Sequence, residues 1–360
     1  MKTLVIIKNA NIGGAERLAI DEVNELYRRG NDVTLVTLGP EWSEHSFLLS
    51  CLLPEAKKVC VPFRSLADIG AWRRLIAVLQ AQRPDVVVTH LWFANTVGRI
   101  AARFAGISKV ISFEHNVYDR VKSRKQFFVD RLLQRLSFKI VAVSEAVRDS
   151  LVAHGIKPSR VVVIENGIDL SRYTNAQPFD IRKEQGLDAG PIFLFVGRLI
   201  EQKGVDVLLN AFAQVPNASL LIAGDGPDRQ KLEQQANELN ISAHVYFLGF
   251  RPDIPALMKS VDCLILPSRW EGQGLVIPEA FAAGLPVIAA DFPPAFSMVK
   301  NDENGFIVPR ENAEALARAM ERMCDTSLRE RLAVKAVQSA SRFSIQRHID
   351  ELLANALDVS

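Results

Sequence analysis

PSRWEGQGLVIPEA occupies residues 267–280 and follows directly on the apolar run 263–266. The run predicts a buried strand, the two glycines predict a tight turn, and the apolar residues from Val276 onward predict a helix. Glycines before a helix let main-chain N–H groups face a ligand, and the helix adds its positive end, so this turn suits an anion. We expect Glu271 to lie beside the anion and Glu279 to reach a second polar group such as a ribose.

Short apolar runs alternate with amphipathic segments on both sides of this stretch, a pattern typical of parallel sheets covered on both faces. At 360 residues the chain is long enough for two domains of about 150 residues each. The polar stretch 170–191 interrupts the alternation and is interpreted as a linker. We therefore expect an α/β fold with two Rossmann-like, doubly wound domains, 1–170 and 171–342, and a helix over 343–360 that crosses back to the first domain. The expected strands are 4–7, 33–37, 86–89, 110–113, 140–143, 161–164, 192–196, 220–223, 245–247, 263–266 and 287–290.

Composition narrows the class of protein. The hydrophobic content of 48% and the charged content of 23% are ordinary globular values. The net charge of +2 conceals an asymmetry, with 24 Lys and Arg against 17 Asp and Glu in residues 1–170, and 19 against 24 in the remainder. A basic first half suits an anionic surface or substrate. Since the basic residues follow no known nucleic-acid-binding motif, no nucleic acid partner is expected.

Cysteine spacing and hydropathy indicate the compartment. None of the four cysteines forms a CxxC pair, so neither a zinc ribbon nor a redox pair is expected, and a cytoplasmic setting fits. No run approaches the roughly 18 apolar residues of a membrane span. Any membrane contact is therefore expected to be peripheral, on the inner face of the cytoplasmic membrane.

A second candidate site follows the expected strand 192–196. Gly197 permits a close backbone turn, Arg198 and Lys203 present two cations, and Gly204 precedes a helix. A diphosphate requires this combination of permissive backbone, donors and cations. The alternative is an ordinary strand–helix loop with solvated charges.

Two weaker candidates follow the next strands. AGDGP, residues 223–227, places Gly224 at a tight strand–helix corner, where it serves either the turn alone or a ligand contact. LGFR, residues 248–251, offers Phe250 and Arg251 for a nucleobase slot, or Phe250 as a packing aromatic.

Two histidines also come directly after expected strands. His115 lies in SFEHN, residues 112–116, and His90 lies in THLW, residues 89–92. We favour His115 for the active site over His90, and a structural role is the alternative for both. The histidines show no metal-ligand spacing, so no metal site is expected.

A basic amphipathic stretch spans residues 118–139. Its cations are interleaved with apolar residues, a pattern compatible with an anionic membrane surface. The alternative is a surface helix that packs its apolar side on the domain. The cations are Arg120, Lys122, Arg124, Lys125, Arg131, Arg135 and Lys139.

The segment from Glu271 to Ile288 resembles the glutamate-pair signature of the family 4 retaining glycosyltransferases. Other stretches resemble the same family in the same order: 13–17, 143–147, 166–169, 197–204 and 224–227. The resemblance covers essentially the whole chain. It implies two Rossmann-like domains facing across a cleft, the GT-B arrangement, with acceptor binding in the first domain and nucleotide-sugar binding in the second.

The resemblance also assigns roles. Arg198 and Lys203 resemble the pair of cations that neutralises the donor diphosphate. Glu271 resembles the glutamate that contacts the transferred sugar, and Glu279 resembles the glutamate that binds the ribose. The backbone at Gln273, Gly274 and Leu275 resembles the phosphate-binding turn. Gly13 and Gly14 resemble the loop that approaches the donor phosphate from the first domain. His115 resembles the histidine that touches the donor sugar.

Two departures from the family pattern concern the donor sugar. The family often has paired glycines and then a glutamate after the strand 287–290, where this chain reads DFPPAFS, residues 291–297. Position 273 is Gln where Phe, Met or Leu is frequent.

The expected function is the transfer of a hexose or N-acetylhexosamine from a UDP-sugar, with a GDP-sugar as the other candidate donor. The expected acceptor is a glycan or a lipid-linked acceptor in envelope polysaccharide or lipopolysaccharide synthesis. Without a DxD motif, no divalent metal is expected to take part. Two alternatives stay open, a sugar-nucleotide epimerase and a non-enzymatic sugar-nucleotide-binding subunit. A dehydrogenase is disfavoured because no GxGxxG follows the first strand.

Overall fold

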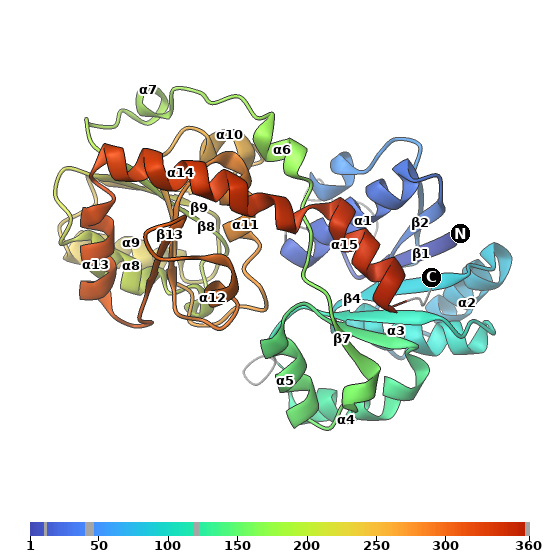
Figure 1. Ribbon diagram of the computed structural model, residues 1–360. Helices are drawn as coiled ribbons and strands as arrows, with labels where there is room; N and C mark the ends of the chain where they lie inside the picture. The colour runs from blue at the N-terminus through green and yellow to red at the C-terminus, as the bar shows by residue number, and fades with distance from the viewer. Residues whose placement is uncertain (11–12, 40–46, 118–121, 357–360) are drawn as a thin grey trace. The chain divides into compact units, whose positions relative to one another are not determined.

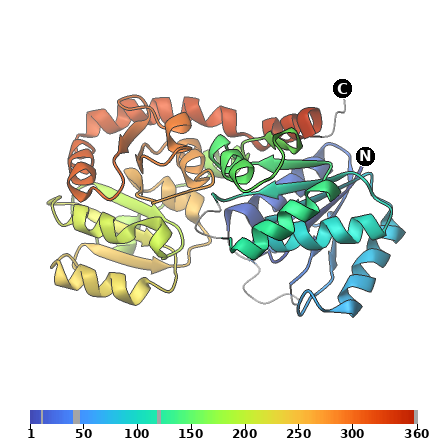
Figure 2. The same cartoon turned by 90° about the horizontal axis from the view of Figure 1, so that it is seen from below.

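The computed structural model describes residues 1–10, 13–39, 47–117 and 122–356 (Figure 1). The chain divides into two compact units, one formed by Met1–Ile168 with Ile345–Ser360 and the other by Asp169–Ser344. Each unit contains a parallel sheet with helices on its two faces (Figure 2). The prediction of an α/β fold with two doubly wound sheets is confirmed.

The sheet of the first unit has the order β3-β2-β1-β4-β5-β6-β7. Alternate residues of its central strand belong to two hydrophobic clusters: Val5 and Ile7 pack with α1 and α15, whereas Leu4 and Ile6 pack with α2 and α3. The strands are β1 (Lys2–Ile7), β2 (Asp32–Thr37), β3 (Lys57–Cys60), β4 (Val86–His90), β5 (Val110–Glu114), β6 (Lys139–Ala142) and β7 (Val161–Val163). The helices are α1 (Gly14–Arg28), α2 (Ile69–Gln82), α3 (Leu91–Phe104), α4 (Arg124–Leu133), α5 (Glu145–Ala153) and α15 (Ile345–Glu351).

The sheet of the second unit has the order β10-β9-β8-β11-β12-β13. Its strands are β8 (Ile192–Val196), β9 (Ser219–Ala223), β10 (Val245–Gly249), β11 (Cys263–Leu266), β12 (Val287–Ala290) and β13 (Gly305–Val308). The longer helices are α8 (Val205–Phe212), α9 (Arg229–Glu238), α11 (Val276–Ala283), α13 (Ala313–Arg322) and α14 (Thr326–Ala340). The short helices are α6 (Leu170–Thr174), α7 (Ile181–Gln185), α10 (Ile254–Met258) and α12 (Ala295–Met298).

The chain leaves the first unit after Ile168 and returns to it at Ile345, whose N–H donates to the Ile168 carbonyl over 2.8 Å. The returning helix α15 docks on α1. Arg29, which caps the C-terminal end of α1, donates to the Asp350 carboxylate over 2.6 Å and to the Gln346 carbonyl over 2.8 Å. The C-terminal helix is therefore a structural part of the first unit.

Two strands were not anticipated from the sequence, β3 and β13. β3 is an edge strand whose residues Lys57 and Lys58 are exposed, so it carries no apolar run. β13 is the edge strand at the other end of the second sheet and contains only four residues. The stretch 170–191, interpreted as a linker, contains the short helices α6 and α7.

Candidate active site

The loops that follow β8 and β11 lie side by side because these strands are neighbours in the second sheet. In the chain, the connections from β8 to β9 and from β11 to β12 run in opposite directions across the sheet. That point is where ligands bind in open α/β sheets. Two hydrogen bonds of 2.8 Å join the loops, from the Gln202 side chain to the Trp270 carbonyl and from the Arg269 N–H to the Gln202 carbonyl.

Lys203 and Glu271 form the charged centre of these loops. Lys203 Nζ lies 2.5 Å from Glu271 Oε1, and Ser268 Oγ donates to the same oxygen over 2.7 Å. Glu271 is only 7% exposed, so its charge needs this compensation. Gly204 follows Lys203 with φ +63°, and a Cβ there would lie 2.3 Å from the Pro267 carbonyl oxygen. The close approach of the loops therefore requires glycine at this position.

Helix α11 begins beside this pair. The first intrahelical bond runs from the Ile277 N–H to the Gly274 carbonyl over 2.9 Å, and Gly274 adopts φ +86°. Gln273 is buried, and Leu275 and Glu279 are half-buried. The aromatic ring of Phe292 lies below the turn, 3.4 Å from where a Cβ on Gly274 would stand. Phe292 belongs to the segment 291–297, so side-chain packing from that segment reaches the turn at Gly274.

Arg198 stands at the end of β8 with its side chain exposed. Within the described part of the chain the Arg198 guanidinium enters no ion pair, whereas the Lys203 ammonium group pairs with Glu271. An unengaged cation beside a helix start is available to an anionic ligand.

Gly197 and Gly224 lie in direct backbone contact. A Cβ on Gly224, which adopts φ +145°, would stand 1.9 Å from the Gly197 carbonyl oxygen. The Gly224 N–H also donates to the Gly249 carbonyl over 2.8 Å. These contacts explain glycine at position 224 by packing alone, so its predicted ligand role gains no support from them.

Phe250 and Arg251 follow β10, two strands away from β8. Phe250 is 47% exposed. The Arg251 guanidinium donates to Asp253 over 2.7 and 2.8 Å and to Glu184 on α7 over 2.7 Å, and these bonds raise its pKa. Arg251 therefore fastens the loop to α7, and its predicted contact with the nucleotide would have to displace these carboxylates.

The first unit has its own crossover point, between β1 and β4. Gly13 and Gly14 stand at the start of α1, where the Arg17 N–H donates to the Gly13 carbonyl over 2.9 Å. His90 ends β4, and His115 follows β5, which is adjacent to β4. His115 Nε2 lies 3.1 Å from His90 Nδ1, and the two rings are stacked. The two candidate histidines are therefore partners.

His115 is nearly inaccessible, with 8% of its surface exposed. Burial lowers the pKa of His115 well below its usual range, and the charge of His90 lowers it further. The imidazole is neutral at physiological pH and serves as a hydrogen-bonding group. Two residues that the sequence did not single out extend this pair: Glu22 of α1 lies 2.9 Å from His90 Nε2, and His348 of α15 lies 2.8 Å from Glu22.

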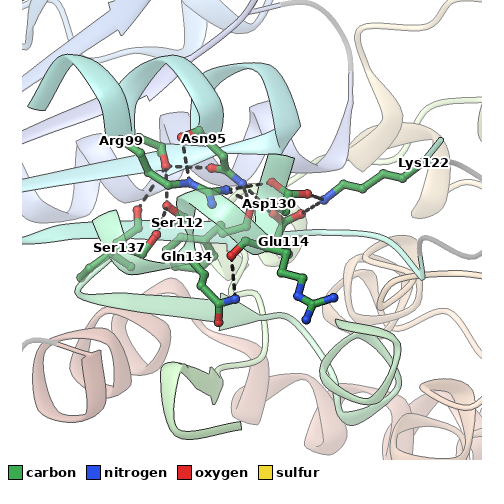
Figure 3. A network of polar contacts seen from close by, with 12 residues as sticks. Asn95, Arg99, Ser112, Glu114, Lys122, Asp130, Gln134 and Ser137 are labelled. Carbon is green, nitrogen blue, oxygen red and sulfur yellow. Dashed lines mark hydrogen bonds and ion pairs between the residues drawn. The ribbon is translucent and has the colours of Figure 1, made fainter. Parts of the chain in front are cut away.

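A buried ion network surrounds Glu114, the residue that precedes His115 in the chain (Figure 3). Lys122 Nζ lies 2.9 Å from Glu114 Oε2 and 2.8 Å from Asp130 Oδ2, and Arg99 lies 3.3 Å from Asp130. Asn95 donates to Glu114 over 3.1 Å. Burial and then the neighbouring Glu114 raise the pKa of Asp130. Lys122 therefore belongs to the interior, and the sequence analysis was wrong to count it with the surface cations of 118–139.

Removal of the Lys122 charge should strongly destabilise the first unit. Lys122→Met leaves two buried carboxylates with Arg99 as their remaining cation, and breaking a buried pair typically costs about 3–5 kcal/mol. Urea denaturation followed by tryptophan fluorescence measures the loss. Lys125→Met, at an exposed position in α4, is the matched control and should change stability by less than about 0.5 kcal/mol. Equal stabilities of the two variants would contradict the role of the network.

Helix α4 exposes both apolar and basic side chains. Ser123 and Gln126 form a capping box at its start. Phe128 is 63% exposed and Leu132 is 59% exposed. The exposed cations on α4 and just after it are Arg124, Lys125, Arg131 and Arg135. Residues 118–121 of the basic stretch, Arg120 among them, lie outside the described residues.

No group of His, Cys, Asp or Glu in the described ranges has the arrangement of a metal site. None of the described helices combines the length and the apolar character that crossing a membrane requires.

Comparison with known proteins agrees with this architecture. The family model "Glycosyltransferase Family 4" matches residues 12–172, and "Glycosyl transferases group 1" matches residues 177–339. The crystal structure of Anabaena HepE in complex with UDP and glucose shares the fold, with a TM-score of 0.89 and 23% identity over 100% of both chains.

Curated relatives span similar lengths. The UDP-Gal:alpha-D-GlcNAc-diphosphoundecaprenol alpha-1,3-galactosyltransferase of Escherichia coli is 26% identical and covers 95% of this chain and 92% of its own. The D-inositol 3-phosphate glycosyltransferase of Rhodococcus erythropolis is 36% identical and covers 75% of this chain and 66% of its own. With both halves matched in order and both sheets of the expected type, the chain belongs to the family 4 glycosyltransferases of GT-B fold.

Proposed function

We propose that this glycosyltransferase moves a hexose or N-acetylhexosamine from a nucleoside diphosphate sugar, a UDP-sugar first, to a glycan or lipid-linked acceptor. The observation that carries the proposal is the arrangement at the β8–β11 point. Lys203, Glu271 and the start of α11 lie together, and Arg198 lies in the same loop as Lys203, two residues after β8. Cations and a helix start suit a diphosphate, and a buried carboxylate suits sugar hydroxyls.

The chemistry follows from the charge that develops during transfer. Departure of the nucleoside diphosphate concentrates negative charge on phosphate oxygens, and prearranged cations and N–H groups stabilise it. Arg198, Lys203 and the N–H groups at Gly274 and Leu275 take this role, with Gly197 and Gln273 shaping the loops around them. Glu279, in the first turn of α11, is assigned to the ribose.

We further infer retention of configuration, with the acceptor attacking on the face from which the diphosphate leaves. The departing phosphate is then the proton acceptor for the attacking hydroxyl. Gly13 and Gly14 at the start of α1 approach the donor phosphate in this proposal, and His115 contacts the sugar. ¹H NMR of the product, which reports the anomeric configuration, tests the inference.

A thermal-shift screen tests the donor class. UDP, GDP, ADP and their common sugars are compared at equal concentration, because a ligand that binds the native state stabilises it by about 2.7 kcal/mol at a hundredfold excess over Kd. Uridine compounds should give the largest shift. No shift with any sugar nucleotide would contradict the proposal. A shift with guanosine compounds alone would mean that the donor is a GDP-sugar and not a UDP-sugar.

Transfer should not depend on a divalent cation. In this proposal Arg198 and Lys203 neutralise the diphosphate, which is the role that a metal ion takes in metal-dependent transfer. Initial rates in excess EDTA should equal those without it. Loss of activity in EDTA that Mg²⁺ or Mn²⁺ restores would contradict this expectation.

A lipid-linked acceptor is supported by the exposed face of α4. Phe128 and Leu132 stand exposed among Arg124, Arg131 and Arg135, and cations with exposed apolar residues bind anionic membrane surfaces. The protein should float with anionic liposomes and much less with neutral ones. The double variant Phe128→Ser/Leu132→Ser should abolish flotation. Equal recovery of the wild-type protein with anionic and neutral liposomes would contradict electrostatic binding to the membrane.

A further inference from the structure

Arg269 lies two residues before Glu271 in the loop that follows β11, and its guanidinium is fully hydrogen-bonded. Nη1 and Nη2 donate to the two carboxylate oxygens of Asp206 over 2.9 and 2.7 Å. Nη1 also donates to the Glu201 carbonyl over 2.5 Å, and Nε and Nη2 donate to the Glu311 carboxylate. All five N–H donors of the side chain therefore have acceptors.

Two of these partners lie on either side of Lys203 in the chain. Glu201 and Lys203 belong to one short 3₁₀ turn, and Asp206 lies in the first turn of α8. A planar fork that holds two points of one segment fixes the chain between them. Since Arg269 is only two residues from Glu271, its side chain sets the separation between the backbones of Lys203 and Glu271.

The main chain of Arg269 is held as well. Its N–H donates to the Gln202 carbonyl over 2.8 Å, and its carbonyl accepts from Arg310 over 3.1 Å. Arg310 in turn donates from Nε to the Asp291 carboxylate over 2.9 Å. Arg269 therefore joins, directly or through Arg310, the loops that follow β8, β11, β12 and β13.

The charge of Arg269 is compensated inside the protein. Its side chain is 16% exposed and pairs with two carboxylates, Asp206 and Glu311. Burial raises the pKa of Asp206, but the hydrogen bonds and the charge of Arg269, together with two main-chain N–H groups, outweigh this and lower it. A phosphate would have to displace both carboxylates to reach the guanidinium. Arg269 is therefore suited to hold the loops and not to bind the donor itself.

We propose that Arg269 is a positioning residue for sugar transfer, whose guanidinium holds Lys203 and Glu271 at the separation that one donor molecule needs between its diphosphate and its sugar. The inference rests on the proposed function, in which Lys203 meets the diphosphate and Glu271 meets the sugar hydroxyls. Groups at a reacting centre must be held close to the productive geometry, and a displacement of about 1 Å can lower a rate about 100-fold.

Arg269→Lys keeps the positive charge and removes the fork, because an ammonium group presents its three donors from a single point. We expect kcat to fall about 10- to 100-fold. The loss should depend on Glu271, since residues that act together have non-additive effects: in the Glu271→Gln background, Arg269→Lys should lower kcat by a factor at least about threefold smaller. Losses that simply multiply would show that Arg269 acts independently of Glu271, which contradicts the inference.

Arg329→Lys is the matched control. The Arg329 side chain is 14% exposed, lies 3.3 Å from the Asp262 carboxylate and donates to the Met323 carbonyl over 2.6 Å. Asp262 precedes β11, so Arg329 holds the opposite end of the same strand. The variant loses a comparable fork far along the strand from Glu271 and should keep the wild-type kcat. Equal losses of kcat in Arg329→Lys and Arg269→Lys would mean that Arg269 acts through stability alone.

Asp206→Asn weakens the same fork from the side of α8 and leaves Arg269 in place, so it tests the inference even if Arg269→Lys does not fold. An amide accepts a weaker hydrogen bond than a carboxylate, and we expect kcat to fall about 3- to 10-fold. An unchanged kcat in Asp206→Asn would overturn the inference.

Amide hydrogen exchange followed by mass spectrometry tests the same contacts without turnover. Peptides that cover 198–206 and 267–275 should exchange faster in Arg269→Lys than in the wild-type protein, while peptides of α14 keep their rates, because exchange reports local opening. Unchanged exchange in both loops would refute the positioning role. The expected exchange pattern in a protein that transfers no sugar would refute the proposed function alone.

Discussion

Arg198→Ala should lower kcat about a hundred- to a thousand-fold, because removal of one donor to a developing oxyanion typically has that effect. The side chain is exposed at the end of β8, so its removal leaves no cavity and no uncompensated buried charge. The Tm should therefore stay at the wild-type value. Initial-rate kinetics with the donor identified by the thermal-shift screen provide the measurement.

The control for this variant is Arg318→Ala. Arg318 is an exposed arginine of the same unit, on α13, and forms a weak ion pair with Glu314 at 3.8 Å. Its replacement removes the same charge from the unit and should leave kcat and KM unchanged. If both variants retain wild-type rates, Arg198 does not act on the diphosphate.

Glu271→Gln should lower kcat about 10- to 100-fold. The carboxylate accepts from Lys203 and Ser268 through one oxygen, and we assign the remaining acceptor capacity to sugar hydroxyls. A hydrogen bond to a charged group contributes about 1.5–3 kcal/mol, and an amide of the same shape loses the charge. Because Lys203 no longer pairs with a carboxylate in this variant, its full charge is available to the diphosphate. The affinity for the free nucleoside diphosphate should therefore not fall.

This combination separates Glu271 from Arg198. Arg198→Ala should weaken binding of the free nucleoside diphosphate, whereas Glu271→Gln should reduce transfer and preserve that binding. Glu233→Gln is the control, since Glu233 also accepts from a cation, Arg229 on α9, over 2.8 Å, but at the surface. Weaker nucleotide binding in Glu271→Gln, measured by calorimetry, would place the carboxylate in a purely structural role.

The local patterns predicted the fold and the loops of the candidate site. Apolar runs alternating with amphipathic segments identified the inner strands of both sheets, whose residues are buried on both faces. β3 escaped because its first two residues are exposed lysines, and β13 escaped because its run of apolar residues, 306–308, is short. Residues 195–204 and 267–280 were singled out because their glycines, cations and helix starts adjoin in sequence.

Contacts across the sheets could not be predicted in the same way. Lys203 and Glu271 are 68 positions apart, and their meeting depends on β8 and β11 being neighbours, which sequence patterns leave open. Glu22 and His348 are 326 positions apart, and each looks like an ordinary polar residue of an amphipathic helix. Lys122 lies in a basic stretch of sequence, and only the tertiary fold shows that it is buried in ion pairs with Glu114 and Asp130.

The most direct test of the account is a crystal structure of the protein soaked with its sugar nucleotide. The account predicts diphosphate oxygens within hydrogen-bonding distance of Arg198, Lys203 and the main-chain N–H groups at the start of α11. A diphosphate bound elsewhere, or these two side chains directed away from it, would contradict the account.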